Sequence, residues 1–515
     1  MNGAEALLNT AAAADIEVCF ANAGTTEMSV VTAFDSNSRI KPILGLFEGV
    51  CTGAADGYGR MKEKPALTLL HLGPGMANGI ANLHNARRAR SPFFMVIGEH
   101  ASWHLKADPL LNMNIAGLCA TFSGWQRTSE SVSAIPADAA DAIAACRYGQ
   151  VASLIIPSDY LWTEYQGAPV TVPSFSPDPI NPERIEAAGR MLLSGKKTAL
   201  IMNGKALLGR GLAAAARIRA KTGCDLFSVT FPSRIERGAG RVSVARIPYF
   251  PDHARTLLAP YEAALFSGTD EPATFFGYEG QPSYFMGPAV QRLRLDDDRQ
   301  DAGLAMEALA DALDAPSEGA LEGVSAPYRR PELPKGKLTP EKVCLVVAAL
   351  QPEDAIVVDE GLTSTTAYAP LGATVAPHSL LYLTGGAIGQ GMPCATGAAV
   401  ACPERPVINI QADGSGMYTL QSLWTQAREA LNVKTLICAN RSYNIIRLEL
   451  DRAGYTEPGA RSLSLIDLGN PNLDWVSLGK GMGVPGVSVD TAEDLVRELK
   501  IALAEPGPRL IEMVL

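Results

Sequence analysis

The chain has 515 residues, enough for two to four domains with well-buried cores, and 47% of them are hydrophobic, as in ordinary globular proteins. Its net charge of −10 and the lack of an extended basic segment argue against a nucleic-acid partner. Its nine cysteines follow neither a disulfide nor a metal-ligand spacing, which is typical of the reducing cytoplasm.

Residues 1–15 predict an Ala-rich helix without a basic leader, so we expect neither a signal nor a transit peptide. No apolar run approaches the ~20 residues that span a bilayer, so we expect a cytoplasmic protein with no membrane partner. The first third alternates helices with short apolar segments, a pattern that predicts a doubly wound parallel sheet over residues 1–168. Its expected strands are Ile16–Phe20, Ile43–Phe47, Ala66–His71, Phe93–Ile97 and Val151–Ile156.

Two segments rich in Pro and Ser or Gly, residues 169–182 and 315–337, predict linkers between three such domains. The middle domain, residues 183–314, has expected strands at Thr198–Met202, Cys224–Val229, Ala263–Phe266 and Arg292–Leu295. The third domain, residues 338–515, has expected strands at Ala355–Asp359, Leu380–Leu383, Val407–Gln411, Lys434–Cys438 and Leu510–Val514. The predicted fold class is therefore α/β, with three doubly wound parallel sheets.

The third domain carries a candidate metal site. Asp413 follows one expected strand, a helix is expected over Met417–Ala430, and Asn440 follows the next strand, 27 residues after Asp413. Both side chains should therefore lie at the carboxyl ends of adjacent parallel strands, where open α/β sheets bind ligands. Carboxylate and amide oxygens suit Mg²⁺, and Gly414 permits a close backbone approach to a diphosphate at the helix start. A helix-capping Asp followed by a turn Asn would give the same pattern.

Glu48 is a candidate acid–base group because it stands where an expected strand ends and a helix begins. Its neighbours Phe47, Val50 and Cys51 would partly desolvate the carboxylate and raise its pKa, which suits proton exchange near neutral pH. A Glu that only favours the helix dipole would also fit the local sequence.

These segments resemble motifs of the thiamine diphosphate-dependent enzymes. The stretch from Ala412 to Asn440 is similar to the family's metal–diphosphate motif, which begins Gly-Asp-Gly, so this chain has Ala412 in place of a Gly. The segment Phe47–Tyr58 is similar to the one whose Glu hydrogen-bonds the aminopyrimidine ring. The loop Gly73–Asn78 resembles that of acetolactate synthase-like members. Together the motifs imply pyrimidine-binding, middle and diphosphate-binding domains in that order.

The resemblance also assigns roles within the third domain. Gly385–Gly389 is similar to the segment whose apolar residue, here Ile388, holds the cofactor in a bent shape, and Glu360–Thr366 resembles the diphosphate-side loop of benzoylformate decarboxylase. The implied metal ligands are Asp413, Asn440 and Ser442. The implied cofactor contacts are Glu48, Thr363, Ser364, Gly386, Ile388, Asp413, Gly414, Ser415, Asn440, Ser442 and Tyr443.

Two further residues are candidates for contact with the substrate. His71 aligns with an active-site His of benzoylformate decarboxylase, and Thr25 lies where that enzyme has a Ser that meets the substrate carboxylate. Either could instead be a structural loop residue, as could His100 and His104. The decarboxylase's second active-site His has no counterpart, because the corresponding region contains Phe275-Phe276-Gly277-Tyr278. That difference weighs against benzoylformate as the substrate.

The resemblance implies a non-oxidative enzyme that uses thiamine diphosphate and Mg²⁺ and acts on a 2-oxo acid. Decarboxylation through an enamine intermediate would end in protonation, as in a decarboxylase, or in transfer to an acceptor carbonyl, as in acetolactate synthase. Glu48 of one subunit would serve the cofactor of another, so we expect at least a homodimer and favour a homotetramer. The alternatives are an acetolactate synthase with FAD in its middle domain, a lyase of 2-hydroxy ketones or aldehydes, and a non-catalytic relative.

Overall fold

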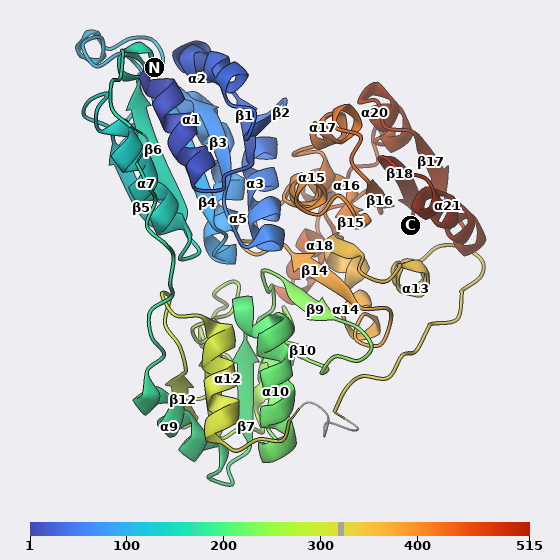
Figure 1. Ribbon diagram of the computed structural model, residues 1–515. Helices are drawn as coiled ribbons and strands as arrows, with labels where there is room; N and C mark the ends of the chain where they lie inside the picture. Colours follow the sequence, from blue (N-terminus) through green and yellow to red (C-terminus); the bar gives the residue numbers. More distant parts are fainter. Residues whose placement is uncertain (169, 318–323) are drawn as a thin grey trace.

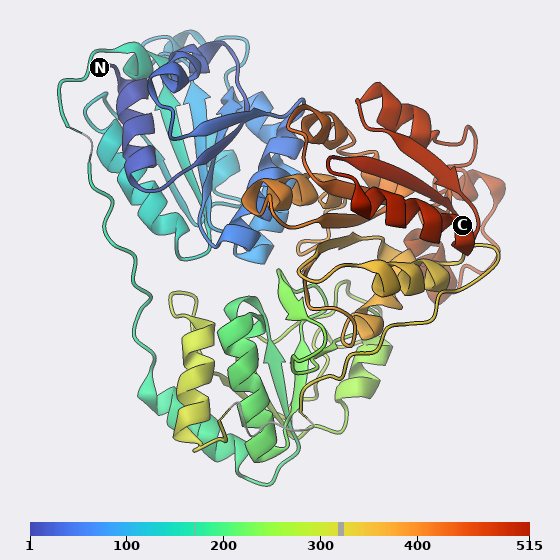
Figure 2. The ribbon, with the colours of Figure 1, turned by 45° about the vertical axis from the view of Figure 1, so that its right-hand side comes forward.

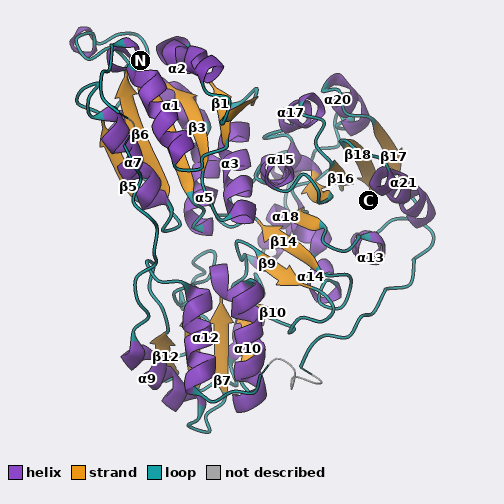
Figure 3. Ribbon diagram, viewed as in Figure 1, coloured by secondary structure: helices purple, strands orange, loops and turns teal. Residues whose placement is uncertain are grey.

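The computed structural model describes residues 1–168, 170–317 and 324–515, so one residue of the first predicted linker and six of the second lie outside the described residues. Three α/β units, each built on its own sheet, succeed one another along the chain (Figure 1). Helices cover the faces of these sheets (Figure 3), which confirms the predicted fold class. Among the described residues, no helix is long and apolar enough to cross a bilayer.

The N-terminal domain has a six-stranded parallel sheet in the order β2-β1-β3-β4-β6-β5. Strands β4 and β6 are buried along their whole length because helices cover both faces of the sheet. The strands are β1 (Val18–Asn22), β2 (Lys41–Leu44), β3 (Ala66–His71), β4 (Phe93–Glu99), β5 (Trp125–Thr128) and β6 (Val151–Pro157). The helices are α1 (Gly3–Ala13), η1 (Thr25–Glu27), α2 (Met28–Ala33), η2 (Phe34–Ser36), α3 (Glu48–Lys62), α4 (Leu72–Asn78), α5 (Ile80–Ala89), η3 (Leu105–Ala107), α6 (Ile115–Cys119), α7 (Ile135–Cys146) and α8 (Ser158–Trp162).

The middle domain is smaller, and the chain reaches it from the N-terminal domain through a long outer connection (Figure 2). Its parallel sheet has the order β10-β8-β7-β11-β12. The strands are β7 (Thr198–Met202), β8 (Asp225–Ser228), β10 (Ala245–Arg246), β11 (Ala263–Ser267) and β12 (Gln291–Arg294). The helices are α9 (Pro182–Leu192), η4 (Gly204–Leu207), α10 (Gly209–Thr222), α11 (Pro251–Leu258) and α12 (Ala302–Ala312).

The C-terminal domain has a seven-stranded sheet in the order β17-β18-β16-β15-β13-β14-β9. Its edge strand β9 (Ile235–Arg237) comes from the middle-domain part of the sequence and pairs antiparallel with β14, so this sheet spans two predicted domains. The other strands are β13 (Ile356–Glu360), β14 (His378–Tyr382), β15 (Val407–Ala412), β16 (Val433–Ala439), β17 (Gly486–Val489) and β18 (Arg509–Val514). The helices are α13 (Pro340–Leu350), η6 (Leu362–Thr365), α14 (Tyr368–Leu371), α15 (Gly391–Ala401), α16 (Asp413–Gly416), α17 (Ser422–Arg428), α18 (Asn444–Arg452), α19 (Ala460–Leu463), α20 (Trp475–Gly481) and α21 (Ala492–Ala504).

Helices α3 and α15 join the N- and C-terminal domains through their backbones. A Cβ atom added at Gly57 would lie 2.1 Å from the Cys394 carbonyl oxygen, and one added at Gly397 would lie 1.8 Å from that of Ala54. The two helices therefore approach closely only because small residues face each other, which fixes how the two domains sit.

One expected helix is wrong in the structure. Residues 417–430 do not form a single helix, because the chain makes short turns between α16 and α17. There the Thr419 hydroxyl group donates to the Gly389 carbonyl oxygen at 2.8 Å, and a Cβ atom at Gly416 would lie 2.8 Å from the Trp475 ring. Tertiary contacts to a neighbouring loop thus override the local helical periodicity.

Candidate active site

The two predicted metal ligands meet at one edge of the C-terminal sheet. Asp413 follows β15 and Asn440 follows β16, and these strands are parallel neighbours. The Asp413 carboxylate accepts hydrogen bonds from the backbone N–H of Arg441 at 2.6 Å and of Gly414 at 2.8 Å. The Asn440 side-chain oxygen accepts one from the Ser442 N–H at 3.0 Å. Backbone N–H groups therefore hold both side-chain oxygens in place even before a metal ion binds.

The chemistry of this edge fits Mg²⁺ bound together with a diphosphate. Burial raises the pKa of Asp413, whereas the hydrogen bonds from backbone N–H groups lower it. A cation beside this carboxyl group would favour its charged form. No cluster of three or more His, Cys, Asp or Glu side chains occurs within the described ranges. A cation here would thus have one carboxylate and one amide oxygen from the chain, and Mg²⁺ accepts such a partial set with phosphate oxygens and water.

Three other predicted cofactor residues pack around these ligands. A Cβ atom at Gly414 would lie 2.5 Å from the Tyr443 ring, so the loops after β15 and β16 touch only because residue 414 is Gly. The buried Ser415 hydroxyl group accepts from the Gln411 side-chain amide at 2.6 Å and donates to the Ala412 carbonyl oxygen at 3.2 Å. These contacts keep the Asp413 turn rigid.

The loop after β14 presents the predicted apolar cofactor support, Ile388. Gly386 and Gly389 flank it with φ angles of +75° and +96°, a conformation that L side chains rarely adopt. A Cβ atom at Gly386 would also lie 2.3 Å from the Phe275 ring of the middle domain. The loop therefore needs both glycines to place Ile388 against the middle domain.

A buried carboxylate holds this loop from the side of the C-terminal sheet. Glu360, at the end of β13, accepts from the Gly389 N–H at 2.6 Å, from the Gly391 N–H, and from the Gln411 side-chain amide at 3.0 Å. Burial raises the pKa of Glu360, and these three donors oppose the change. Because every partner is a donor, the site accommodates a carboxylate better than any neutral side chain.

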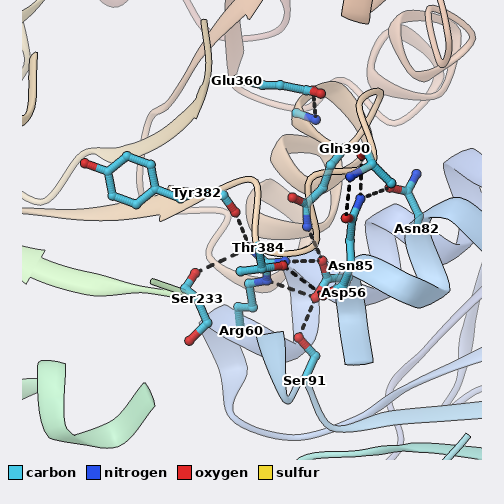
Figure 4. Close-up of polar contacts among 12 residues, drawn as sticks. Asp56, Arg60, Asn82, Asn85, Ser91, Ser233, Glu360, Tyr382, Thr384 and Gln390 are labelled. Carbon is cyan, nitrogen blue, oxygen red and sulfur yellow. Dashed lines mark hydrogen bonds and ion pairs between the residues drawn. The ribbon is translucent and has the colours of Figure 1, made fainter. Parts of the chain in front are cut away.

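Helix α5 holds the same loop from the side of the N-terminal domain (Figure 4). The Asn85 side chain donates to the Ala387 carbonyl oxygen at 2.8 Å and accepts from its N–H at 3.2 Å. The His84 ring nitrogen Nε2 lies 3.2 Å from the Gly385 carbonyl oxygen, and the Asn82 amide donates to that of Gly389 at 3.4 Å.

A buried ion pair lies where the three domains meet (Figure 4). Asp56 and Arg60, on consecutive turns of α3, are almost fully buried and share a hydrogen bond of 2.9 Å from Nε to Oδ1. Arg60 also donates to the Tyr382 carbonyl oxygen and the Thr384 hydroxyl group, each at 2.8 Å, and to the Ser233 carbonyl oxygen at 3.4 Å. These hydrogen bonds to β14, to the loop that follows β14 and to the middle domain satisfy the positive charge of Arg60, which would otherwise be costly to bury.

A cavity of about 1010 Å³ lies between the middle and C-terminal domains. Gly386 and Ile388 line it beside Thr363, whose hydroxyl group accepts from the Asn444 side-chain amide at 3.3 Å. Ser364, the next predicted cofactor contact, is buried behind this wall. Aromatic side chains of the middle domain form the opposite wall: Phe231, Tyr249, Phe250, Phe275 and Phe276. The sequence had related only Phe275 and Phe276 to the active-site region, as the segment that replaces the decarboxylase's second His, and it gave no role to the other three.

The predicted catalytic residues lie in the N-terminal domain. Glu48 is the first residue of α3, and its half-buried carboxylate accepts from the Asn78 side-chain amide at 3.0 Å. His71 ends β3, and its Nδ1 atom lies 2.8 Å from the fully buried Glu27 carboxylate and 3.1 Å from the Thr26 hydroxyl group. Thr25 is exposed. The threonine whose hydroxyl group contacts the His71 ring is instead Thr26, the next residue in the chain.

Glu27 is a functional candidate that sequence analysis missed. Its carboxylate accepts from the Gly24 N–H at 2.8 Å and from the Thr26 hydroxyl group, and it faces His71. A Cβ atom at Gly24 would lie 2.3 Å from the His71 ring, so the turn after β1 is packed onto that ring. His100, half-buried after β4, lies near His104 and His71, and burial lowers the pKa of its ring. The signal available in the sequence was that Glu27 follows Gly24 by three residues, a spacing that is typical of a Glu that caps the start of a helix.

The structure does not bring all the predicted residues into one site. In the described part of the chain, no N-terminal domain residue lines the cavity that contains Ile388 and Thr363. Glu48, His71 and Thr25 instead lie on their own domain, where exposed apolar side chains such as Met28, Val31 and Leu46 lie near them in the sequence.

Comparisons with known proteins cover all three domains. Residues 1–118 match the N-terminal, and residues 361–513 the C-terminal, thiamine pyrophosphate-binding domain of thiamine pyrophosphate enzymes. A Mycobacterium tuberculosis protein, IlvX, provisionally named as an acetolactate synthase large subunit, is 45% identical over 100% of this chain and 99% of its own length. Benzoylformate decarboxylase of Pseudomonas aeruginosa is 28% identical over 96% of this chain and 95% of its own.

Solved structures show the same fold. The thiamine diphosphate-dependent 4-hydroxybenzoylformate decarboxylase of Rhodococcus jostii RHA1 superposes with a TM-score of 0.86 at 22% identity, covering 99% of this chain and 98% of that one. The family models account for both cofactor-binding domains, and the IlvX match extends over the middle domain as well. The chain therefore belongs to the thiamine diphosphate-dependent enzymes, in the group of acetolactate synthases and benzoylformate decarboxylases.

Proposed function

We propose that the chain is a non-oxidative decarboxylase of a 2-oxo acid that works with thiamine diphosphate and Mg²⁺. When bound, thiamine diphosphate supplies a carbon nucleophile and an electron sink for the loss of CO₂. Asp413 and Asn440 would hold the metal, with Ser442 as the third predicted ligand. Glu48 would exchange a proton with the cofactor's aminopyrimidine ring.

The observation that carries this proposal is the contact between His71 and Glu27. A carboxylate at 2.8 Å favours a proton on Nδ1 of the ring, which leaves Nε2 to bind or deliver a proton. The His71 side chain is 23% exposed, so a substrate can reach it. A positioned proton donor favours protonation of the product, which gives an aldehyde, over transfer to a second carbonyl compound.

We further propose that two copies of the chain complete each site, with Glu48 of the partner subunit facing the cavity of the first. Two observations support this: the described residues that line the cavity all come from the middle and C-terminal domains, and apolar side chains such as Met28 (56% exposed) and Leu46 (45% exposed) are exposed in the N-terminal domain. The minimum assembly is then a homodimer, and a homotetramer would pair two of them. Size-exclusion chromatography with light scattering tests the assembly.

The test of the activity is a panel of 2-oxo acids incubated with the cofactor-loaded protein. We expect CO₂ release with an aldehyde as the main product, identified by nuclear magnetic resonance. A hydroxy ketone as the main product would instead establish a carboligase. A flavin absorbance spectrum in the purified protein would favour the FAD-containing alternative, and no CO₂ release from any acid would overturn the proposal.

A further inference from the structure

We propose that the cavity contains a second anion-binding subsite, formed by Arg237, Arg246 and Tyr382, that binds a carboxylate on the substrate other than its 2-oxo acid group. The three residues line the cavity on the wall made by β9, β10 and β14. Ile388 and Thr363 line it from the loops after β14 and β13. This inference rests on the proposed function for the identity of the substrate, but the subsite itself rests on the following contacts.

Arg246 is one of two cations on this wall. Its guanidinium group lies over the Tyr382 ring, 5.1 Å from the ring centroid, and it makes no ion pair within the described ranges. The Tyr382 hydroxyl group is buried and has no hydrogen-bond partner in the same part of the chain. Figure 4 shows the Tyr382 ring pointing away from the Arg60 cluster. An aromatic face and an unpaired guanidinium are thus placed together on one wall.

Arg237 adds a second cation beside the first. It is 6% exposed, and among the described residues it donates only to backbone, to the Ala369 carbonyl oxygen at 2.8 Å and that of Val244 at 3.5 Å. Its Nε atom is buried and has no hydrogen-bond partner among those residues. Burial lowers the pKa of Arg237, and Arg246 adds to the effect. A buried cation without an anion is unfavourable, so an anion in the cavity would stabilise this wall.

The nearest acid does not fill this role. Asp359 also lines the cavity, but its carboxylate accepts from the Thr365 hydroxyl group at 2.7 Å and the Gly361 N–H at 3.1 Å. Burial raises the pKa of Asp359, and the charge of Arg246 opposes that change. Two guanidinium groups and this one carboxylate line the same part of the cavity, so positive charge is in excess there, and a guanidinium pairs especially well with a planar carboxylate.

Aromatic side chains also line this cavity, beside the loop that carries Ile388. Phe275 packs on Phe231 and Tyr249 with ring centroids 5.9 and 5.3 Å apart, and it also contacts Gly386. Aromatic side chains favour a flat, apolar body. The substrate class is therefore a 2-oxo acid whose apolar, preferably aromatic, body ends in a carboxylate.

The test compares two substrates of the cofactor-loaded enzyme that differ in one group, 4-carboxyphenylglyoxylate and phenylglyoxylate. We expect wild-type kcat/KM to favour the first by at least about tenfold, as charge-assisted hydrogen bonds can provide. Arg246→Met should lower this ratio by about 10- to 100-fold, mainly through KM. Arg190→Met, which removes an exposed surface charge, should leave the ratio unchanged. Tyr382→Phe, which removes one hydroxyl group, should lower the ratio by a few-fold even if Arg246→Met fails to fold.

Calorimetric titration of the same loaded enzyme with terephthalate and benzoate, which do not react, gives a readout independent of turnover. Tighter binding of terephthalate that depends on Arg246 supports the subsite, even if no 2-oxo acid is turned over and the proposed activity fails. Equal binding of the two probes, or a substrate ratio that neither variant changes, overturns the subsite while the decarboxylase can stand. Weaker thiamine diphosphate binding by Arg246→Met with an unchanged substrate ratio would also overturn it, because Arg246 would then serve the cofactor.

Discussion

The N- and C-terminal parts of the proposed site differ in the atoms that hold their carboxylates. In the C-terminal domain, Asp413 and Glu360 are buried and accept mainly from backbone N–H groups. In the N-terminal domain, Glu48 accepts from a side-chain amide, and Glu27 faces a His ring and a Thr hydroxyl group as well as a backbone N–H. Backbone donors fix geometry, whereas side-chain partners can move and exchange protons. This comparison is consistent with the proposal that the C-terminal part holds the metal and diphosphate, while the N-terminal part contacts the cofactor's aminopyrimidine ring and transfers protons.

The largest effect should come from removing the acid of the proton-transfer part. Glu48→Gln should lower kcat by about 10²- to 10⁴-fold, because an amide cannot exchange the proton that a carboxyl group exchanges. Thiamine diphosphate affinity, measured by calorimetry, should change little. Glu183→Gln, at the exposed start of α9, is the matched control. Turnover that survives Glu48→Gln would disprove the assigned role.

His71 and His378 provide a second contrast, between an accessible and a buried imidazole. Burial lowers the pKa of His378 to about 4, so this ring stays neutral in the folded protein. An unfolded His binds a proton near pH 6.5, so the folded state loses stability as the pH falls from about 6.5 toward 4. The expected loss is about 3 kcal/mol from this group. In urea unfolding, the free energy of unfolding of His378→Gln should depend correspondingly less on pH between pH 7 and 4 than that of the wild type. An equal pH dependence in the two proteins would contradict the lowered pKa of His378.

The pairing of Glu27 with His71 predicts a coupled effect. Glu27→Gln should lower kcat by about 10- to 100-fold, because the ring loses the acceptor that fixes its orientation. If Glu27 acts through His71, adding Glu27→Gln to His71→Ala should cause little further loss. Steady-state kinetics of the two single variants and the double variant measure this coupling. Fully additive losses would show that Glu27 acts independently of the ring.

The smallest effect should come from the clamp on the Ile388 loop. Glu360→Gln replaces one acceptor oxygen by an NH₂ group that faces a backbone N–H donor, so the loop should loosen. The expected cost is about 1.4 kcal/mol, or roughly a tenfold weaker thiamine diphosphate affinity. Glu341→Gln, in the first turn of α13, is a control that leaves the loop untouched. Unchanged affinity in Glu360→Gln would mean that the loop does not position the cofactor.

Local sequence patterns were sufficient to predict the candidate site residues that directly follow the ends of strands. Asp413 and Asn440 were found because one βαβ unit brings residues 27 positions apart to the same sheet edge. The helix expected between them was wrong because Thr419 bonds to a loop distant in sequence. The rest of the aromatic wall (Phe231, Tyr249 and Phe250) and Arg246 could not be predicted, since they reach the site only through the packing of the middle domain on the C-terminal domain. Strand β9 is likewise set by a pairing between domains.

The most direct test of the central claim is a calorimetric titration of metal-stripped protein with thiamine diphosphate, with and without Mg²⁺. If Asp413 and Asn440 hold the metal that binds the diphosphate, tight binding requires Mg²⁺ and is lost in Asp413→Ala. Binding that is equally tight without Mg²⁺, or that survives in Asp413→Ala, would contradict the assigned metal site. No binding under either condition would contradict the whole account.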